Sequence, residues 1–150
     1  TYPMFFFRER LTPYHPSRED WTQPGDLRIV ELPNFADLSM ESKDTYGRDM
    51  DQWPLYRTEG TDAMLRHVDG FIGYAQSRGV VPFLCFYFHP WEFHPMPQGD
   101  IRSSEGAVRP DPFITRNCGA YAVEQLDLLV RRLRDRGAEF MQARRAAELW

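Results

Sequence analysis

A histidine and a carboxylate follow directly after the most apolar run of the sequence, residues 80–88. His89 is the first side chain after that run that can carry a charge, and Pro90 stops the run at this point. Trp91 and Glu92 come next, and they supply an apolar wall and a carboxylate that can orient the imidazole ring. This pattern favours a histidine that acts in proton transfer. The alternative is a structural histidine that caps the strand through a backbone hydrogen bond.

A second set of polar side chains follows another strand-like stretch, residues 28–32. Asn34 and Asp37 lie just beyond it. Because functional groups gather at the carboxyl ends of strands in parallel β/α architectures, we expect both side chains near the same rim as His89. For Asp37, the role of a helix cap is an equal alternative.

Glu92 and His94 together resemble part of a metal cluster. Pro90 and Pro95 interrupt the segment, however, and prevent a helical pair of ligands. The sequence also has no glycine-rich phosphate loop, no serine in a nucleophile elbow and no Cys-x-x-Cys pattern. We therefore predict no metal ligands within residues 1–150.

The elements that must position these residues alternate between strands and helices. Helical spacing predicts a helix over 61–79, capped by Thr61 or Asp62, and another that ends at Gly137. Strands are predicted over 2–7, 28–32, 80–88 and 138–141, and a last helix over 143–150. This order is typical of an α/β fold with a parallel sheet and outer helices. The second helix is predicted to bury six apolar positions, Tyr121, Val123, Leu126, Leu129, Val130 and Leu133.

Composition sets limits on the class of protein. A chain of 150 residues with 42% hydrophobic and 15% aromatic residues can form one folded domain. The net charge of -4 and the scattered arginines argue against nucleic acid as a partner, and no apolar run is long enough to span a membrane. Cys85 and Cys118 follow no disulfide framework, so we expect two buried free thiols.

Four segments, residues 27–33, 84–93, 139–141 and 144–150, resemble in order and spacing the later half of NodB-like polysaccharide deacetylases. The resemblance covers most of the chain, and Phe86 to Phe93, read as FYFHPWEF, is its most specific part. It implies a distorted (β/α) barrel in which a divalent metal, commonly zinc, activates water to remove an N- or O-acetyl group from a sugar. His89 matches the family histidine that acts as general acid.

The resemblance also implies a substrate site. Tyr87 stands where the family usually has a leucine that lines the acetyl pocket, and Trp21 or Trp91 would help to form this pocket. The expected catalytic residue is therefore His89. The expected substrate-binding residues are Tyr87, Trp91, Glu92, Asn34 and Trp21.

The metal-binding motifs of the family are absent from this sequence. It contains no Asp-Asp motif, no His-x-x-x-His pair and no Arg-x-Pro-Tyr motif, all of which belong to the N-terminal half of such proteins. We therefore expect residues 1–150 to form the C-terminal part of a single deacetylase domain, completed by a missing N-terminal half that holds the zinc. The alternative is a non-catalytic carbohydrate-binding or assembly module. Cell envelope and cytoplasm are both open as locations.

Overall fold

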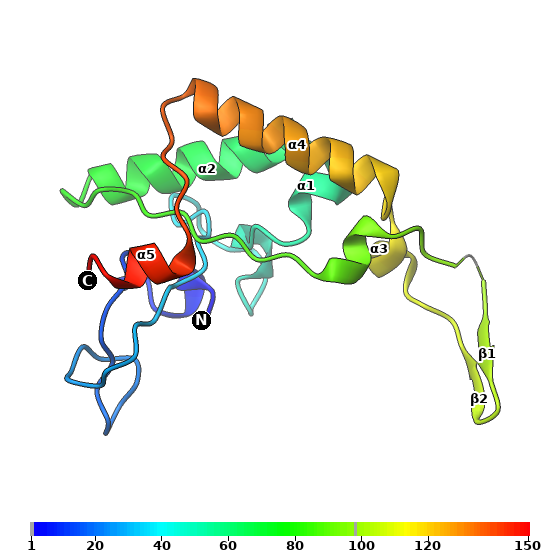
Figure 1. Cartoon of the computed structure of the whole chain (residues 1–150), viewed down its shortest axis with the longest axis horizontal. Helices are drawn as coiled ribbons and strands as arrows, with labels where there is room; N and C mark the ends of the chain where they lie inside the picture. Colours follow the sequence, from blue (N-terminus) through cyan, green and yellow to red (C-terminus); the bar gives the residue numbers. More distant parts are fainter. Residues whose placement is uncertain (1, 98) are drawn as a thin grey trace.

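A computed structural model describes residues 2–97 and 99–150 (Figure 1). Helices dominate it, with one small two-stranded sheet. The α-helices are α1 (Leu55–Thr58), α2 (Thr61–Gln76), α3 (Pro112–Thr115), α4 (Ala120–Asp135) and α5 (Ala143–Ala147). The 3-10 helices are η1 (Met4–Phe6), η2 (Arg48–Met50) and η3 (Pro90–Phe93), and the strands are β1 (Ile101–Ser103) and β2 (Gly106–Val108).

The two long helices, α2 and α4, lie side by side along one edge of the molecule, with α1 tucked against them (Figure 1). The predicted helix over 61–79 is confirmed, although Gly60 occupies the N-cap position instead of Thr61 or Asp62. Gln125 of α4 compensates for the missing cap, since its side-chain oxygen accepts the Thr61 N–H at 2.8 Å. In the described part of the chain, no helix combines the length and apolar content that a bilayer crossing requires.

The second predicted helix is confirmed as α4, but its inward face is narrower than expected. Ala122, Leu129 and Leu133 are buried, whereas Tyr121 and Val123 are exposed. The buried residues recur at helical spacing and form one stripe toward α2, and the two exposed residues flank its first position. The prediction that Tyr121 and Val123 point inward is therefore wrong.

One apolar core joins the N-terminal segment, the loop after residue 34 and the long helices. Aromatic rings hold its centre, where Phe35 lies 5.8 Å from Phe71 and 4.9 Å from Phe86 between ring centroids. Its buried members are Met4, Leu11, Phe35, Ala36, Leu38, Met50, Tyr56, Met64, Leu65, Val68, Phe71, Ala75, Ala122, Leu129 and Leu133.

The four predicted strands are not formed as strands. Residues 4–6 form η1, while 28–32, 80–88 and 138–141 have no strand assignment. Isolated backbone contacts occur where a continuous ladder of strand hydrogen bonds was expected. Pro3 and Asn34 form a parallel bridge, and the Phe35 N–H donates to the Cys85 carbonyl at 3.2 Å. These contacts bring residues near the predicted strands together, but the bridge of Glu31 within 28–32 runs antiparallel to Tyr14, and too few backbone pairs align to make a sheet. The barrel itself stays a prediction.

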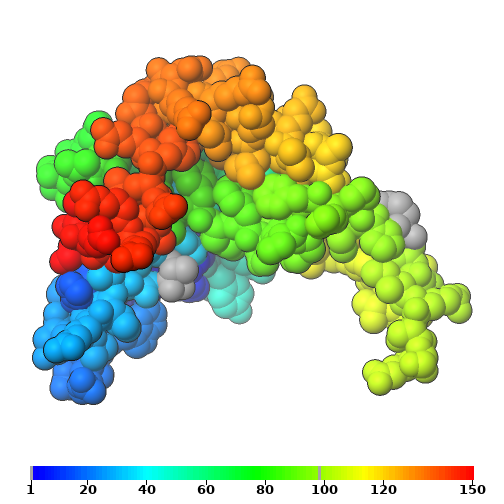
Figure 2. Space-filling view, viewed as in Figure 1, coloured from blue at the N-terminus to red at the C-terminus, as the bar shows by residue number. Residues whose placement is uncertain are grey.

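The sheet that does form lies within residues 90–117, where no strand is predicted. Strands β1 and β2 make an antiparallel hairpin, and all six of their residues are exposed. The hairpin projects away from the body of the molecule (Figure 2). Cys85 and Cys118 are not joined in a disulfide, as predicted, but both are half-buried and not buried.

A pair of glycines in α2 tests this packing. A β-carbon at Gly70 would lie 2.3 Å from the Asp37 carboxylate, whereas Gly73 has open space around it. We expect Gly70→Ala to lower the free energy of unfolding by about 1–3 kcal/mol through overpacking. Gly73→Ala should raise it by about 0.5–1 kcal/mol, because alanine is the better helix former. Urea denaturation measures both, and equal effects in the two variants would contradict the packing of Asp37 on α2.

Candidate functional site

The candidate site is built around Glu92, a carboxylate in η3 with no solvent exposure. Its Oε1 accepts the His89 backbone N–H at 2.8 Å and lies 3.2 Å from His89 Nδ1. Pro90 at the first position of the turn pre-sets its backbone for this geometry. The short sequence His-Pro-Trp-Glu therefore brings imidazole and carboxylate together within a single turn.

Arg57 of α1 balances the charge of Glu92 from the other side. Its Nε donates to Glu92 Oε2 at 2.5 Å, and both side chains are fully buried. Arg57 also donates to the Arg116 carbonyl at 2.6 Å, and Asn117 Nδ2 donates to the Arg57 carbonyl at 2.9 Å. The ion pair thus joins α1, η3 and the approach to α4.

Two aromatic side chains complete the surroundings of the carboxylate. Trp53 Nε1 donates to Oε1 at 2.8 Å, and the Tyr56 hydroxyl lies 3.4 Å from Oε2. Burial raises the pKa of Glu92, but hydrogen bonds from the His89 backbone, Arg57 and Trp53 outweigh burial and hold this pKa below its ordinary value. The pKa of Tyr56 is raised by burial and then by the Glu92 charge. Glu92 is therefore ionised at neutral pH.

The imidazole of His89 sits among three aromatic rings. Trp91 stacks on it at 5.3 Å between centroids, Trp53 meets it edge-on at 5.0 Å, and Tyr87 lies at 5.8 Å. The His89 side chain nevertheless keeps 41% of its surface exposed. The ring is thus held in place and still open to an outside molecule.

This arrangement suits a histidine that moves protons. Because Glu92 is an ionised acceptor, it favours the tautomer in which Nδ1 carries a proton toward it. Nε2, the second ring nitrogen, is then an acceptor in the neutral ring and a donor in the charged one. A buried carboxylate that orients a histidine from behind is the logic of catalytic triads, where the far nitrogen does the chemistry.

Two of the other predicted residues, Asn34 and Trp21, lie apart from this site. Asn34 is buried, and its Oδ1 accepts from Cys85 Sγ at 3.4 Å. Trp21 packs instead against Tyr2 and Phe7, at 5.2 and 5.4 Å between centroids. Trp91 and Tyr87 do lie beside His89, whereas Glu92 is buried behind the ring, where it orients the ring and does not line an open surface.

Sequence reasoning missed Arg57 and Tyr56. Both lie in the stretch 35–60, between the predicted strand 28–32 and the predicted helix 61–79, where the sequence has few periodic apolar positions and predicts no helix or strand. The short helix α1 places them there, and it is only four residues long. A signal that would point to Arg57 is hard to find, because a single arginine in a loop is usually exposed.

The described residues do not form a metal centre. No group of three or more histidine, cysteine, aspartate or glutamate side chains comes together in residues 2–97 and 99–150. Glu92, the carboxylate nearest His89, already accepts from Arg57 and Trp53. The zinc implied by the family resemblance therefore does not fit onto these residues alone.

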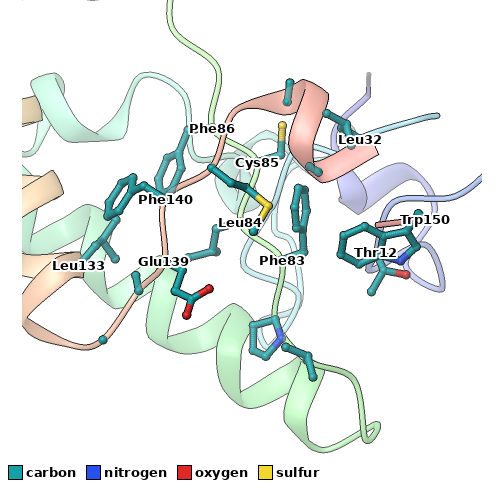
Figure 3. Close-up of a pocket in the computed structure, with 17 residues that line it drawn as sticks. Thr12, Leu32, Phe83, Leu84, Cys85, Phe86, Leu133, Glu139, Phe140 and Trp150 are labelled. Carbon is teal, nitrogen blue, oxygen red and sulfur yellow. The ribbon is translucent and has the colours of Figure 1, made fainter. Parts of the chain in front are cut away.

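A larger cavity of about 670 Å3 lies apart from His89 (Figure 3). Apolar side chains from residues 81–86, the end of α4 and the C-terminal segment line it, with Phe83, Phe86, Phe140 and Trp150 among them. None of the aromatic rings around His89 contributes to this wall. Its lining is mostly apolar, with Thr12, Cys85 and Glu139 as its polar side chains.

The Glu92–Arg57 pair predicts a pH-dependent stability. The pKa of Glu92 is lower in the folded than in the unfolded chain. The ionised carboxylate therefore adds to the free energy of unfolding above about pH 4.3, and this contribution is lost as the pH falls further. Glu92→Gln leaves Arg57 buried without its counter-charge, so we expect a loss of about 3–5 kcal/mol at pH 7. Glutamine does not titrate, so the free energy of unfolding of the variant should not show the decrease at low pH that protonation of Glu92 causes.

Urea denaturation between pH 3 and pH 7 measures this effect. The control is Asp100→Asn, which removes the exposed ion pair with Arg109 and should change the free energy of unfolding by less than about 0.5 kcal/mol. A Glu92→Gln variant as stable as the control at pH 7 would show that the buried pair contributes nothing.

Comparison with known proteins adds no relative. No protein-family model matches this chain, and neither the curated proteins nor the solved structures contain a match. The resemblance to polysaccharide deacetylases therefore rests on the residues quoted for it, and it stays a prediction.

Proposed function

We propose that this chain supplies the proton-transfer histidine of a polysaccharide deacetylase-like hydrolase, which cleaves the acetyl group from nitrogen or oxygen of a sugar. The observation that supports it most is the contact of 3.2 Å between His89 Nδ1 and the buried Glu92 carboxylate, with the ring still 41% exposed. Such a ring can carry a proton to a substrate without losing its orientation.

The proposed step is protonation of the leaving group. As the bond between the acetyl carbon and the sugar nitrogen or oxygen breaks, His89 Nε2 gives its proton to that atom. The ring then becomes neutral, and Nδ1 keeps its hydrogen bond to Glu92. Glu92 keeps the ring oriented throughout the transfer, as a carboxylate behind a catalytic histidine does.

Zinc belongs to this proposal only through the family resemblance. When bound, it would supply the activated water that attacks the acetyl carbonyl. Its ligands would come from outside residues 1–150, from the N-terminal half that the resemblance implies. The proton transfer assigned to His89 depends on this chain's own residues alone.

A non-catalytic sugar-binding module is the second candidate. The aromatic cluster of Trp53, Tyr87 and Trp91 around an exposed histidine favours it, because aromatic side chains with a few polar groups are typical of ligand sites. In such a module the Glu92–Arg57 pair would serve only to hold the cluster in place. Sugar binding that needs no metal and releases no acetate would favour this candidate.

The test is release of acetate from acetylated chito-oligosaccharides by the protein isolated from its source with its zinc retained. We expect His89→Ala to lower turnover by about 10²–10⁴-fold, the range of a general acid, with the zinc content unchanged. His94→Ala is the matched control, since it removes a histidine five residues further along the same segment, and it should retain turnover.

Unchanged acetate release by His89→Ala would overturn the assignment of His89. Loss of activity in both variants would point to a structural effect of the segment instead. Circular dichroism on each variant checks that the fold is kept.

A further inference from the structure

A second, smaller cavity opens beside His89. It measures about 460 Å3 and is lined by Arg48, Asp51, Trp53, Pro54, Tyr87 and Phe113. Trp53 and Tyr87 are shared with the surroundings of His89, whose ring lies 5.0 and 5.8 Å from theirs between centroids. The cavity therefore adjoins two of the rings that surround the imidazole, although His89 itself does not line it.

Asp51 and Tyr87 supply acceptors to the cavity that are only partly used, whereas Arg48 is a donor whose Nε already donates to Asp44. Asp51 Oδ2 accepts the Tyr87 hydroxyl at 3.1 Å, and Asp51 Oδ1 accepts the Trp53 backbone N–H at 3.2 Å. Each carboxylate oxygen retains a lone pair, and so does the Tyr87 oxygen once its hydrogen is donated. The pair therefore offers acceptors to a ligand that brings hydrogen-bond donors.

A partly buried carboxylate is costly when it faces an apolar group. Burial raises the pKa of Asp51, and the bonds from Trp53 and Tyr87 only partly offset this effect. A methyl group placed against Asp51 would remove water and return no hydrogen bond, whereas a hydroxyl group would replace the bond to water. The chemistry of this wall thus selects against a methyl group and for a hydroxyl group.

The remaining walls of the cavity are aromatic or apolar surfaces on which the face of a ring can stack. Trp53 and Tyr87 stack with their planes 22° apart and their centroids 6.3 Å apart, and Pro54 and Phe113 add apolar surface. The indole of Trp53 is itself fixed, because its Nε1 donates to the buried Glu92. Fixed aromatic walls with a few placed polar atoms are the usual composition of a small-molecule site.

We propose that this cavity binds a sugar ring of the substrate through its hydroxyl groups, with Asp51 and Tyr87 as the residues that read those hydroxyls. The inference rests on the proposed function, since it takes the ring to belong to the acetylated sugar that His89 acts on. It places the polar edge of the sugar at Tyr87, the position at which the family resemblance predicts an apolar pocket for the acetyl methyl.

The experiment compares two ligands that differ at their hydroxyl groups, which methylation converts from donors into methyl ethers. The first is the tetramer of N-acetylglucosamine, and the second is the same tetramer with every hydroxyl methylated. Calorimetric titration of the full protein should give at least about tenfold weaker binding for the methylated form, the cost of a lost hydrogen bond to a charged group.

Two variants test whether the hydroxyl-dependent binding takes place in this cavity. Asp51→Asn keeps the side-chain volume but has a single acceptor oxygen, and we expect about tenfold weaker binding of the unmodified tetramer. Tyr87→Phe keeps the ring and removes the hydroxyl, so it should weaken binding as well. The control is Asp100→Asn, the same chemical change at an exposed position outside the cavity, which should bind like the parent protein.

Equal binding of the two tetramers, or unchanged binding by both Asp51→Asn and Tyr87→Phe, would overturn the proposal. The same holds if the parent protein binds neither tetramer. Acetate release is recorded separately in each protein: hydroxyl-dependent binding without any acetate release would refute the proposed hydrolysis and keep the sugar site. Normal release with an unchanged KM in Asp51→Asn would refute the sugar site and keep the hydrolysis.

Discussion

The buried ion pair between Arg57 and Glu92 is the interaction on which the rest of this structure depends. Two charges without solvent exposure are costly to bury, and their attraction offsets this cost only when both are well hydrogen-bonded. Glu92 meets this condition, since it accepts from the backbone of His89, the guanidinium of Arg57 and the indole of Trp53. Arg57 meets it in part, because its Nε and Nη1 donate while its buried Nη2 has no hydrogen-bond partner. The backbone carbonyl of Glu92 also accepts the N–H of Gly119 at 2.8 Å, so the same residue anchors the start of α4.

The same carboxylate serves the fold and the proposed proton transfer. It holds η3 against α1, and it orients the imidazole of His89 toward the solvent side. A change that weakens the ion pair would therefore loosen the histidine as well as the core. Trp53 extends this coupling one step further, because its indole contacts Glu92 on one side and lines the smaller cavity on the other.

Local patterns predicted the helices and the position of His89 well, because both depend on residues close in sequence. Helical spacing located α2 and α4, and the run that ends at Pro90 placed His89 beside Glu92. The strands could not be predicted in the same way, because an apolar run becomes a strand only when another segment pairs with it. The role of Arg57 could not be predicted for a related reason. Its partner, Glu92, lies 35 residues further along the chain, and no residue near Arg57 in the sequence indicates that contact.

The exposed hairpin of β1 and β2 divides the chain into two portions of unequal length. Exposed loop tips are preferred sites of cleavage by proteases, and every residue of these two strands is accessible. The portions on either side remain joined without the hairpin, through the bond from Arg57 to the Arg116 carbonyl and the bonds from Thr61 to Gln125. A chain nicked in the hairpin would thus persist as a non-covalent complex of two fragments, running as two bands in a denaturing gel and as one species in solution.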